Sequence, residues 1–328
     1  MKTVTLDKSS DKPRLKIVSL AAGVGWTNED LSELSQLGEF TQVSKRPQTP
    51  AQVVDQLRNA DYAIVAPLEK GHLSALVFDN VPRLRGMSLV TNRYNWVDIE
   101  AAQTRGLIIS TLGNYAEIPV AEFALGLILD LARRITMAVN RTKAGLRWFE
   151  GFQGFELHGK TLGIIGLGSI GTRLAQKAKG IGINVIGYNR TPLHTFVPQV
   201  SIETLLHESH IVSMNLALNN DTGQFLSREM LLLMNPEAIL VNVSPEGLID
   251  QGAVYEMLIQ NRLAGYGFEV DELKIHQIQQ RLLQLENVIA TPHTGWYTTE
   301  AVQRLRRVTI ENLRAMITGK PINNVAGL

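Results

Sequence analysis

The sequence has no cysteine among its 328 residues. This absence excludes disulfide bonds, thiolate metal sites and a cysteine nucleophile, and it fits a reducing compartment. No segment approaches the ~18 apolar residues of a membrane-spanning helix, and the first residues lack the apolar core of a signal peptide. The formal net charge is only +1, without a block of Lys or Arg, which argues against nucleic acid or an anionic membrane as the partner. We therefore expect a cytoplasmic protein that acts on a small molecule.

Short β-branched segments alternate with helical patterns along the chain, as in parallel sheets that are covered on both faces. The length exceeds one ordinary core, and the contents of 45% hydrophobic and 19% charged residues are near globular averages. The expected strands form two sets, the first 15–20, 40–43, 62–66, 87–90 and 107–110, the second 161–165, 184–188, 210–215, 238–242, 265–268 and 288–291. We predict an α/β protein with two Rossmann-like, doubly wound parallel-sheet domains and a cleft between them.

Two long helical patterns decide the expected domain boundaries. The first, 118–139, is apolar around most of its circumference, so we expect its own domain and the second subunit of a homodimer to bury it. The second, 299–318, follows the last strand and is expected to return to the first domain. The prediction is a substrate-binding, flavodoxin-like domain of residues 1–112 and 297–328, with a dinucleotide-binding Rossmann domain, 113–296, inserted in it.

The most informative motif is Gly166-x-Gly168-x-x-Gly171, which follows an apolar strand and opens a helical pattern. Gly166 allows the tight turn, Gly168 lets backbone N–H groups approach phosphates, and Gly171 lets the helix pack close to the strand. The positive end of the helix then lies on the anion. In this context the motif predicts that a dinucleotide coenzyme binds here.

The next expected strand ends on Asn189, Arg190 and Thr191, about 20 residues past the glycines, where an NAD site usually has an acidic residue for the ribose hydroxyl. Asn189 carries no charge to repel a 2′-phosphate, and Arg190 and Thr191 can bind one. These residues favour NADP(H) as coenzyme, while NAD(H) stays open. The alternative interpretation is a solvated Arg beside the turn at Pro192.

Several separate stretches resemble the D-isomer-specific 2-hydroxyacid dehydrogenases, and the resemblance covers nearly the whole chain. The stretches are residues 97–102, 115–124, 159–166, 240–250 and 287–296. The resemblance implies a two-lobed dehydrogenase with a nicotinamide coenzyme. It also implies that Glu269 replaces an Asp that contacts the nicotinamide amide. The full set of expected coenzyme contacts is Gly166, Gly168, Ser169, Ile170, Gly171, Asn189, Arg190, Thr191, Leu216, Ala217, Val243, Ser244, Glu269 and His293.

The catalytic residues depart from the family pattern. The resemblance implies an Arg that binds the substrate carboxylate and carbonyl, a Glu, and a His that gives or takes a proton. In this sequence Pro245 stands in the position of the Arg, Lys274 stands in that of the Glu, and only His293 is kept. A nearby Lys274 ammonium would favour a neutral His293 imidazole that accepts a proton, or Lys274 itself would be the acid. The alternative is a solvated Lys274 on a surface loop.

A second departure lies in the expected substrate loop, Thr91-Asn92-Arg93-Tyr94-Asn95-Trp96. Arg93 stands where the family usually has a Gly, so we hypothesise that its guanidinium replaces the missing clamp on the substrate carboxylate. The alternative is an outward-facing Arg93. We expect an anionic substrate held by Thr91, Asn92, Arg93, Tyr94, Trp96 and Trp296, although core packing is an equally good explanation of the two tryptophans.

Three hypotheses for the function remain. The leading one is hydride transfer from NADPH to a non-standard C=O, C=N or activated C=C substrate, with His293 as acid or base. The second is a conventional 2-keto acid reductase that uses Arg93 and Lys274, and the third is a non-catalytic NAD(P)-binding sensor or partner-binding protein. No metal site is expected, because His158, His194, His207, His210 and His276 lack metal-ligand spacing with carboxylates.

Overall fold

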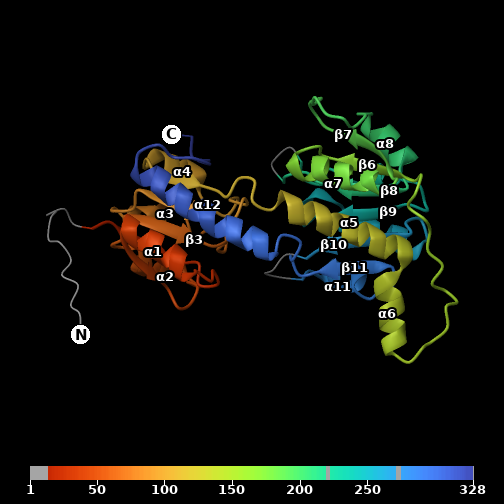
Figure 1. The fold of residues 1–328 in the computed structure, drawn as a ribbon, viewed down its shortest axis with the longest axis horizontal. Coiled ribbons are helices and arrows are strands. Elements are labelled where there is room, and N and C mark those ends of the chain that lie inside the picture. Colours follow the sequence, from red (N-terminus) through yellow and green to blue (C-terminus); the bar gives the residue numbers. More distant parts are fainter. Residues whose placement is uncertain (1–13, 219–221, 271–274, 328) are drawn as a thin grey trace. The chain divides into compact units, whose positions relative to one another are not determined.

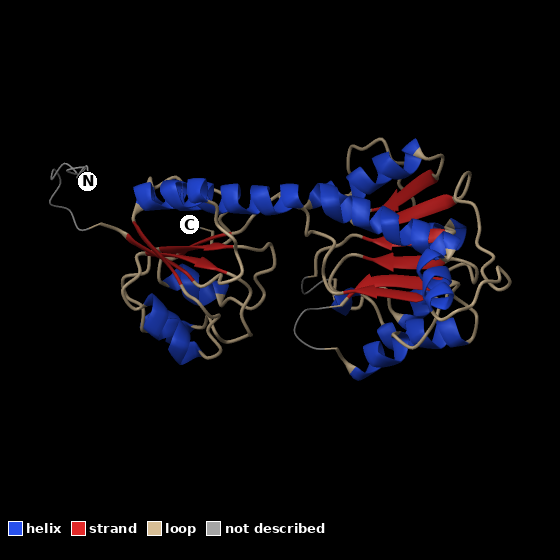
Figure 2. Ribbon diagram, turned by 60° about the horizontal axis from the view of Figure 1, so that its bottom comes forward, coloured by secondary structure: helices blue, strands red, loops and turns tan. Residues whose placement is uncertain are grey.

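The computed structural model describes residues 14–218, 222–270 and 275–327. Lys274 lies outside these ranges. The chain divides into two compact units, the first of residues 1–115 and 299–328, the second of residues 116–298. Each unit holds one parallel sheet, and Figure 2 shows helices on both faces of each sheet. The predicted fold class, α/β with two doubly wound parallel sheets, is confirmed.

The first unit has a five-stranded sheet in the order β2-β1-β3-β4-β5 (Figure 1). This is the order of flavodoxin-like folds. The central strands β3 and β4 are buried along their whole length, whereas the edge strand β2 is half exposed. The strands are β1 Lys16–Ser19, β2 Glu39–Gln42, β3 Tyr62–Val65, β4 Gly86–Leu89 and β5 Ile108–Ser110, and the helices are α1 Asn28–Leu37, α2 Pro50–Leu57, α3 Ala75–Asp79, α4 Ile99–Thr104 and α12 Thr299–Ile317.

The C-terminal segment belongs to the first unit because α12 packs against α1 and β4. The buried amide of Asn312 donates to Ser88 Oγ at 3.2 Å and to the carbonyl oxygen of Thr111 at 2.8 Å. Beyond the helix, the backbone N–H of Val325 donates to the carbonyl oxygen of Ile109 at 2.8 Å. Helix α12 and the segment after it are thus hydrogen-bonded to β4 and to the end of β5.

The second unit has a six-stranded parallel sheet in the order β11-β10-β9-β8-β6-β7. Its strands are β6 Thr161–Ile165, β7 Asn184–Tyr188, β8 Ile211–Met214, β9 Ile239–Asn242, β10 Gly265–Glu269 and β11 Val288–Thr291. Its helices are α5 Glu117–Arg133, α6 Ile135–Lys143, α7 Ser169–Gly180, α8 Ile202–Glu208, α9 Arg228–Leu231, the short 3₁₀ helix η1 Glu246–Leu248, α10 Gln251–Ile259 and α11 Gln277–Leu282.

Neighbouring side chains of one strand enter different cores in this unit. Ile164 packs with α5 and α7 on one face, and Ile165 packs with α8 to α11 on the other. Strands buried on both faces read as continuous apolar runs rather than as alternating patterns. The same arrangement brings the carboxyl ends of β6, β8, β9, β10 and β11 to one edge of the sheet, where ligands bind in open α/β sheets.

The single helix predicted for residues 118–139 is wrong, because the chain breaks at Arg134. This residue has a φ of +53° and ends α5, and its N–H donates to the carbonyl oxygen of Asp130. The carboxylate of Asp130 then accepts from Thr136, at 2.7 Å from the backbone N and 2.5 Å from Oγ1. The new helix α6 has no buried residue, so the apolar side chains beyond the break lie at the surface of the unit.

Candidate active site

Two glycines, one just after β6 and one in the first turn of α7, have no room for a side chain. Gly166 has a φ of +95°, and a Cβ there would lie 2.6 Å from the carbonyl oxygen of Asn215. A Cβ on Gly171 would collide with the carbonyl oxygen of Gly166 and lie 3.0 Å from Ile164 Cγ2. The two glycines therefore let β6, β8 and α7 converge at the point where the strand order reverses.

Gly168, between these two, has open space beside it, because a Cβ there would meet nothing within 4 Å. It is the exposed N-cap residue of α7, which has no side-chain cap and no acidic residue in its first turn. The N–H groups of a first helical turn, here those of Ser169 and Ile170, lack partners within the helix. This positive, uncrowded helix end fits a pyrophosphate group, so the residues present fit a dinucleotide coenzyme.

Asn189 lies at the end of β7 and connects the glycine loop with the following turn. Its Oδ1 accepts from the backbone N of Leu167 at 3.2 Å, and its Nδ2 donates to the carbonyl oxygen of Thr191 at 2.8 Å. Arg190 and Thr191 are exposed beside it. The residue at this strand end is thus fixed by two hydrogen bonds and brings no negative charge to the ribose position.

Ser244 joins the ends of β8 and β9. Its backbone N donates to Asn242 Oδ1 at 3.0 Å, and its hydroxyl donates to the carbonyl oxygen of Met214 at 3.2 Å. Three more of the expected coenzyme contacts follow the same two strand ends, namely Leu216, Ala217 and Val243. The structure brings these residues to the edge of the sheet that carries the glycine loop.

The segment after β9 is tied to α11. Pro245 has no N–H group to donate, and the next residue, Glu246, accepts a hydrogen bond from the fully buried Gln279. The other carboxylate oxygen of Glu246 lies 3.4 Å from His276 Nε2, and the backbone N of His276 donates to Gln279 Oε1 at 2.9 Å. His276, left without a task by the sequence analysis, is therefore part of a network. A His with Gln three positions later resembles a capping box, which is the signal that could have indicated it.

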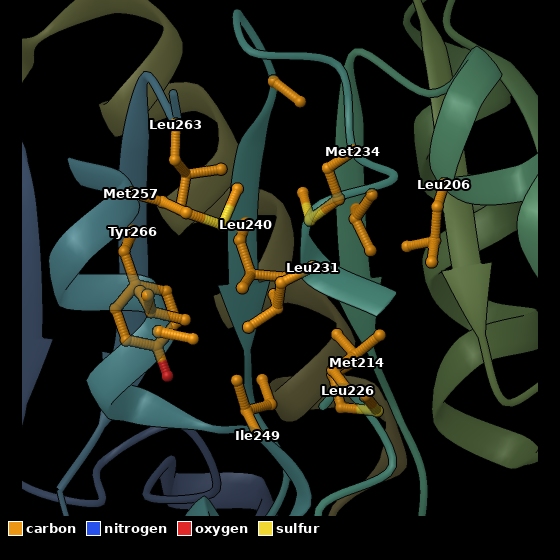
Figure 3. Packing of buried hydrophobic residues seen from close by; sticks show 14 of the residues in the cluster. Leu206, Met214, Leu226, Leu231, Met234, Leu240, Ile249, Met257, Leu263 and Tyr266 are labelled. Carbon is orange, nitrogen blue, oxygen red and sulfur yellow. The ribbon is translucent and has the colours of Figure 1, made fainter. Parts of the chain in front are cut away.

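Tyr266 lies below these strand ends, inside the hydrophobic core of the second unit (Figure 3). Its ring is fully buried and stacks on Phe268, with 4.7 Å between centroids and an interplanar angle of 10°. Burial raises the pKa of the Tyr266 hydroxyl, and the neighbouring Asn242 amide opposes the shift in part. Among the described residues, neither the hydroxyl of Tyr266 nor Nδ2 of Asn242 has a hydrogen-bond partner of normal geometry.

His293 lies in the turn after β11. It is half buried and has a φ of +54°, and its backbone N donates to the carbonyl oxygen of Thr291 at 2.9 Å. Glu269, at the end of the neighbouring strand β10, is 8% exposed, and its Oε1 accepts from the backbone N of Gly295 at 2.7 Å. The buried carboxylate and the turn that carries the imidazole are therefore directly connected.

In the first unit, the expected substrate loop is held by its own side chains. Thr91 Oγ1 accepts from the backbone N of Arg93 at 3.1 Å. Asn92 donates to the carbonyl oxygen of Gly113 at 2.6 Å and accepts from the backbone N of Leu112 at 3.0 Å. The half-buried Arg93 thus extends from a loop that is fastened to the segment after β5.

The aromatic residues expected near the substrate have different surroundings. Trp96 is 8% exposed within the core of the first unit, and its Nε1 donates to the carbonyl oxygen of Arg93 at 2.8 Å, so it supports the loop from the core. Tyr94 is exposed. In the second unit, Trp296 is half buried and meets Tyr297 edge-on, with 5.2 Å between the ring centroids.

Two other features are absent from the described part of the chain. Residues 14–218, 222–270 and 275–327 contain no group of three or more His, Asp or Glu side chains that could hold a metal ion. Within these ranges, no helix combines the length and the apolar character that crossing a membrane requires.

The chain is similar to known proteins over most of its length. The family described as D-isomer specific 2-hydroxyacid dehydrogenase, NAD binding domain, matches residues 125–295. A glyoxylate reductase of Korarchaeum cryptofilum is 31% identical over 284 residues, which are 84% of this chain and 85% of that protein. A D-3-phosphoglycerate dehydrogenase of Methanocaldococcus jannaschii is 30% identical over 85% of this chain, but the match spans only 54% of that protein.

One solved structure is similar over almost the whole chain. An acyclic imino acid reductase in complex with NADPH and D-Arg gives a TM-score of 0.86 at 28% identity, covering 95% of this chain and 100% of that one. The chain belongs to the D-isomer specific 2-hydroxyacid dehydrogenase family, as the resemblance indicated. It contains the NAD-binding domain of these oxidoreductases, and the expectation of a nicotinamide dinucleotide coenzyme is confirmed.

Proposed function

We propose that this protein is an NADPH-dependent reductase that acts on the C=N bond of an imino acid rather than on a simple 2-keto acid. The observation that carries the proposal is Pro245. It stands where the resemblance implies the substrate-binding Arg, and the segment around it is built into a network through Glu246, His276 and Gln279. The glycine loop, in contrast, keeps a geometry that fits the coenzyme.

The chemistry of the two bonds differs in the charge that develops. Reduction of a ketone places negative charge on oxygen, and the loss of one preorganised donor at such an oxygen costs about 10²- to 10³-fold in rate. An imine nitrogen is more basic than a ketone oxygen and is protonated before or during hydride addition, so the product is a neutral amine. A site without a guanidinium beside the reacting bond is therefore better suited to C=N than to C=O.

The residues of the chain then have separate tasks. The N-terminus of α7 and Gly168 hold the pyrophosphate, and His293 gives a proton to the imine nitrogen. Arg93 binds the carboxylate of the anionic substrate. When bound, NADPH supplies the hydride that the imine carbon accepts, and the amine and NADP⁺ are the products. The solved imino acid reductase, which was obtained with NADPH and D-Arg, supports this choice of substrate class.

We also propose that NADP(H) is preferred over NAD(H). Support comes from Asn189, which adds no charge at the end of β7, and from the exposed Arg190 and Thr191. Asn189→Asp keeps the oxygen that accepts from Leu167 but adds a carboxylate. We expect it to weaken NADPH binding by about tenfold or more and to improve NADH binding. Titration of the intrinsic fluorescence with each coenzyme measures both, and unchanged affinities would count against the assignment.

The second unit has an apolar surface that supports the proposed homodimer. Trp148 and Phe149 are 69% and 80% exposed and stack on each other, with 6.2 Å between the ring centroids. The apolar side chains exposed on α6 are Ile135 and Val139. Exposed apolar patches of this kind mark association surfaces. Light scattering after size-exclusion chromatography tests the state, and a double change of Trp148 and Phe149 to Ser should yield monomers.

The experiment on function compares NADPH consumption by the same 2-keto acids with and without a primary amine that forms the imine in solution. Glyoxylate, pyruvate and phenylpyruvate, each alone and with excess ammonium or methylamine, make a suitable panel. We expect rates about tenfold or more higher with the amine, since the site lacks the donor that a ketone needs. Fast turnover of the keto acids alone would instead support a conventional reductase that uses Arg93 and Lys274. Coenzyme binding without any turnover would support a sensor.

A further inference from the structure

The buried carboxylate of Glu269 has a partner that the sequence does not indicate. An ionised carboxylate is buried at a high cost unless hydrogen bonds compensate for the lost water. Glu269 is 8% exposed at the end of β10, and its Oε1 lies 2.7 Å from the backbone N of Gly295. At 2.7 Å this is a short N–H···O hydrogen bond, and it fastens the backbone of Gly295 to the side chain of Glu269.

Gly295 is enclosed on two sides. A Cβ at this position would lie 3.0 Å from Glu269 Oε2 and 3.0 Å from Phe123 Cδ1 of α5. A side chain at residue 295 would therefore fit only if Glu269 or Phe123 shifted, so the glycine favours this close approach of the backbone to the carboxylate. The strand β10 on one side and the helix α5 on the other hold one end of the turn after β11 in place (Figure 1).

The other end of the same turn is the end of β11 itself. In the sheet, Glu269 is directly opposite Thr291, the last residue of β11. His293 follows two residues later in a left-handed conformation, and its backbone N donates to the carbonyl oxygen of Thr291. Two fixed points, Thr291 in the strand and Gly295 on the carboxylate, thus bracket His293.

We infer that Glu269 is the positioning residue for His293, and that it acts through the backbone of Gly295 rather than through its charge on the reacting atoms. The inference rests on the proposed role of His293 as the proton donor. It also explains why the side chain is Glu: Asp at the same strand position would be one methylene shorter and would fall short of Gly295. Misplacement of a catalytic group by ~1 Å costs about 100-fold in rate.

Three substitutions separate length from charge. Glu269→Gln keeps the length and an oxygen that accepts from Gly295, Glu269→Asp keeps the charge but shortens the reach, and Glu269→Ala removes both. We expect the Gln variant to retain kcat within about threefold, and the Asp and Ala variants to lose about 100-fold in kcat with little change in KM. An Asp variant that outperforms the Gln variant would overturn the inference, because charge would then be the property that matters.

A second measurement does not depend on any substrate. The sequence contains three Thr-Gly pairs, at residues 222–223, 294–295 and 318–319, so labelling with [¹³C-carbonyl]threonine and [¹⁵N]glycine leaves three amide signals for NMR. We expect the Gly295 amide to be protected from hydrogen exchange in the original protein and in the Gln variant. It should exchange at least about tenfold faster in the Asp and Ala variants, since a broken hydrogen bond exposes the N–H.

The kinetic and exchange measurements distinguish failure of the proposed function from failure of the role inferred for Glu269. If none of the panel substrates is reduced, the proposed function fails, and the exchange rates alone still decide whether Glu269 holds the turn. Equal protection of Gly295 in all four proteins would overturn the inference even if the reductase activity is found. Thermal unfolding of each variant controls for general loss of structure.

Discussion

The ends of β6 and β9 lie on the same edge of the same sheet, yet they are built by different means. The end of β6 is shaped mainly by the backbone, because Gly166 and Gly171 leave no space for a Cβ and Gly168 leaves open space. The end of β9 is shaped by side chains. The amide of Gln279 in α11 donates a hydrogen bond to Glu246, which follows Pro245. The end of β6 thus depends on glycines, which have no side chain, and the end of β9 depends on a specific pair of polar side chains.

The two strand ends differ in how freely they can change their chemistry. A backbone cradle suits the phosphates that every nicotinamide coenzyme has, and a Cβ at two of its three glycines clashes with the strand or helix beside it. The polar contacts after β9 are made by side chains beyond the end of the strand, so exchanging such a pair should leave the sheet intact. We therefore expect variants at the first end to lose the coenzyme and variants at the second to change the substrate.

The largest effect is expected from Gly171→Ala. The added methyl group collides with the carbonyl oxygen of Gly166, which is backbone and cannot rotate away, so β6 and α7 must separate. We expect a loss of about 3 kcal/mol in the free energy of unfolding and of 100-fold or more in NADPH affinity. Chemical denaturation and fluorescence titration measure the two quantities.

Two other alanines serve as controls for this effect. Gly180→Ala makes the same change at the other end of α7, where the methyl group meets nothing within 4 Å, and should leave stability and affinity unchanged or slightly improved. Gly168→Ala should leave stability unchanged and reduce NADPH affinity, because its methyl group enters only the space assigned to the phosphates. If Gly168→Ala binds NADPH normally, the pyrophosphate does not lie there.

The next largest effect is expected from His293→Asn. Asn tolerates the left-handed φ of +54° that residue 293 adopts, so the turn is kept while the acid is removed. Turnover should fall by about 10²- to 10⁴-fold, the usual contribution of a general acid. Steady-state rates with the best substrate of the panel provide the test, and full activity would exclude His293 as the proton donor.

Pro245→Arg is expected to produce a gain of function at the end of β9. The φ of −54° at residue 245 suits an arginine as well as a proline. A guanidinium at this position should raise the reduction of pyruvate or glyoxylate by about 10- to 100-fold, while reduction of the imines rises less. Pro245→Gln is the control without charge. If the Arg variant reduces keto acids no faster, the site differs from that of a keto acid reductase by more than this one hydrogen-bond donor.

Much of the fold could be predicted because the strands are continuous apolar runs. Tyr62–Val65 and Ile211–Met214 are buried at every position, and such runs alternating with helices define parallel sheets. The break at Arg134 could not be predicted, because no glycine marks it. The left-handed φ of that residue is accompanied by the bonds between Asp130 and Thr136, which become visible only in three dimensions.

The site divides in the same way. The glycine loop was predicted from a local pattern with a steric reason. The bond between Glu246 and Gln279 joins residues 33 positions apart, and the bond between Glu269 and Gly295 joins residues 26 positions apart. Pairs of this kind depend on the register of β9, β10 and β11, which propensity does not specify, so the sequence indicated the residue types at the strand ends without their partners.

The smallest effect is expected from Tyr266→Phe, below the end of β9. Burial raises the pKa of the Tyr266 hydroxyl from its ordinary value of 10.0. The unfolded chain therefore releases this proton above pH 10, whereas the folded protein keeps it. Stability is fully present below pH 10 and falls above it by ~1.4 kcal/mol per pH unit for one proton. Removing the hydroxyl should abolish this part of the alkaline loss.

Since the hydroxyl has no hydrogen-bond partner of normal geometry among the described residues, its removal should change stability at pH 7 by less than ~1 kcal/mol. Denaturation at pH 7 and at several values above pH 10 measures both effects. Tyr62→Phe is the matched control in the first unit, where burial also raises the pKa of the tyrosine hydroxyl but Arg85 opposes the increase. If the free energy of unfolding falls with pH above 10 just as steeply in the Phe variant, Tyr266 ionises in the folded protein. Water would then reach the polar atoms near the end of β9, and this region would be open rather than packed.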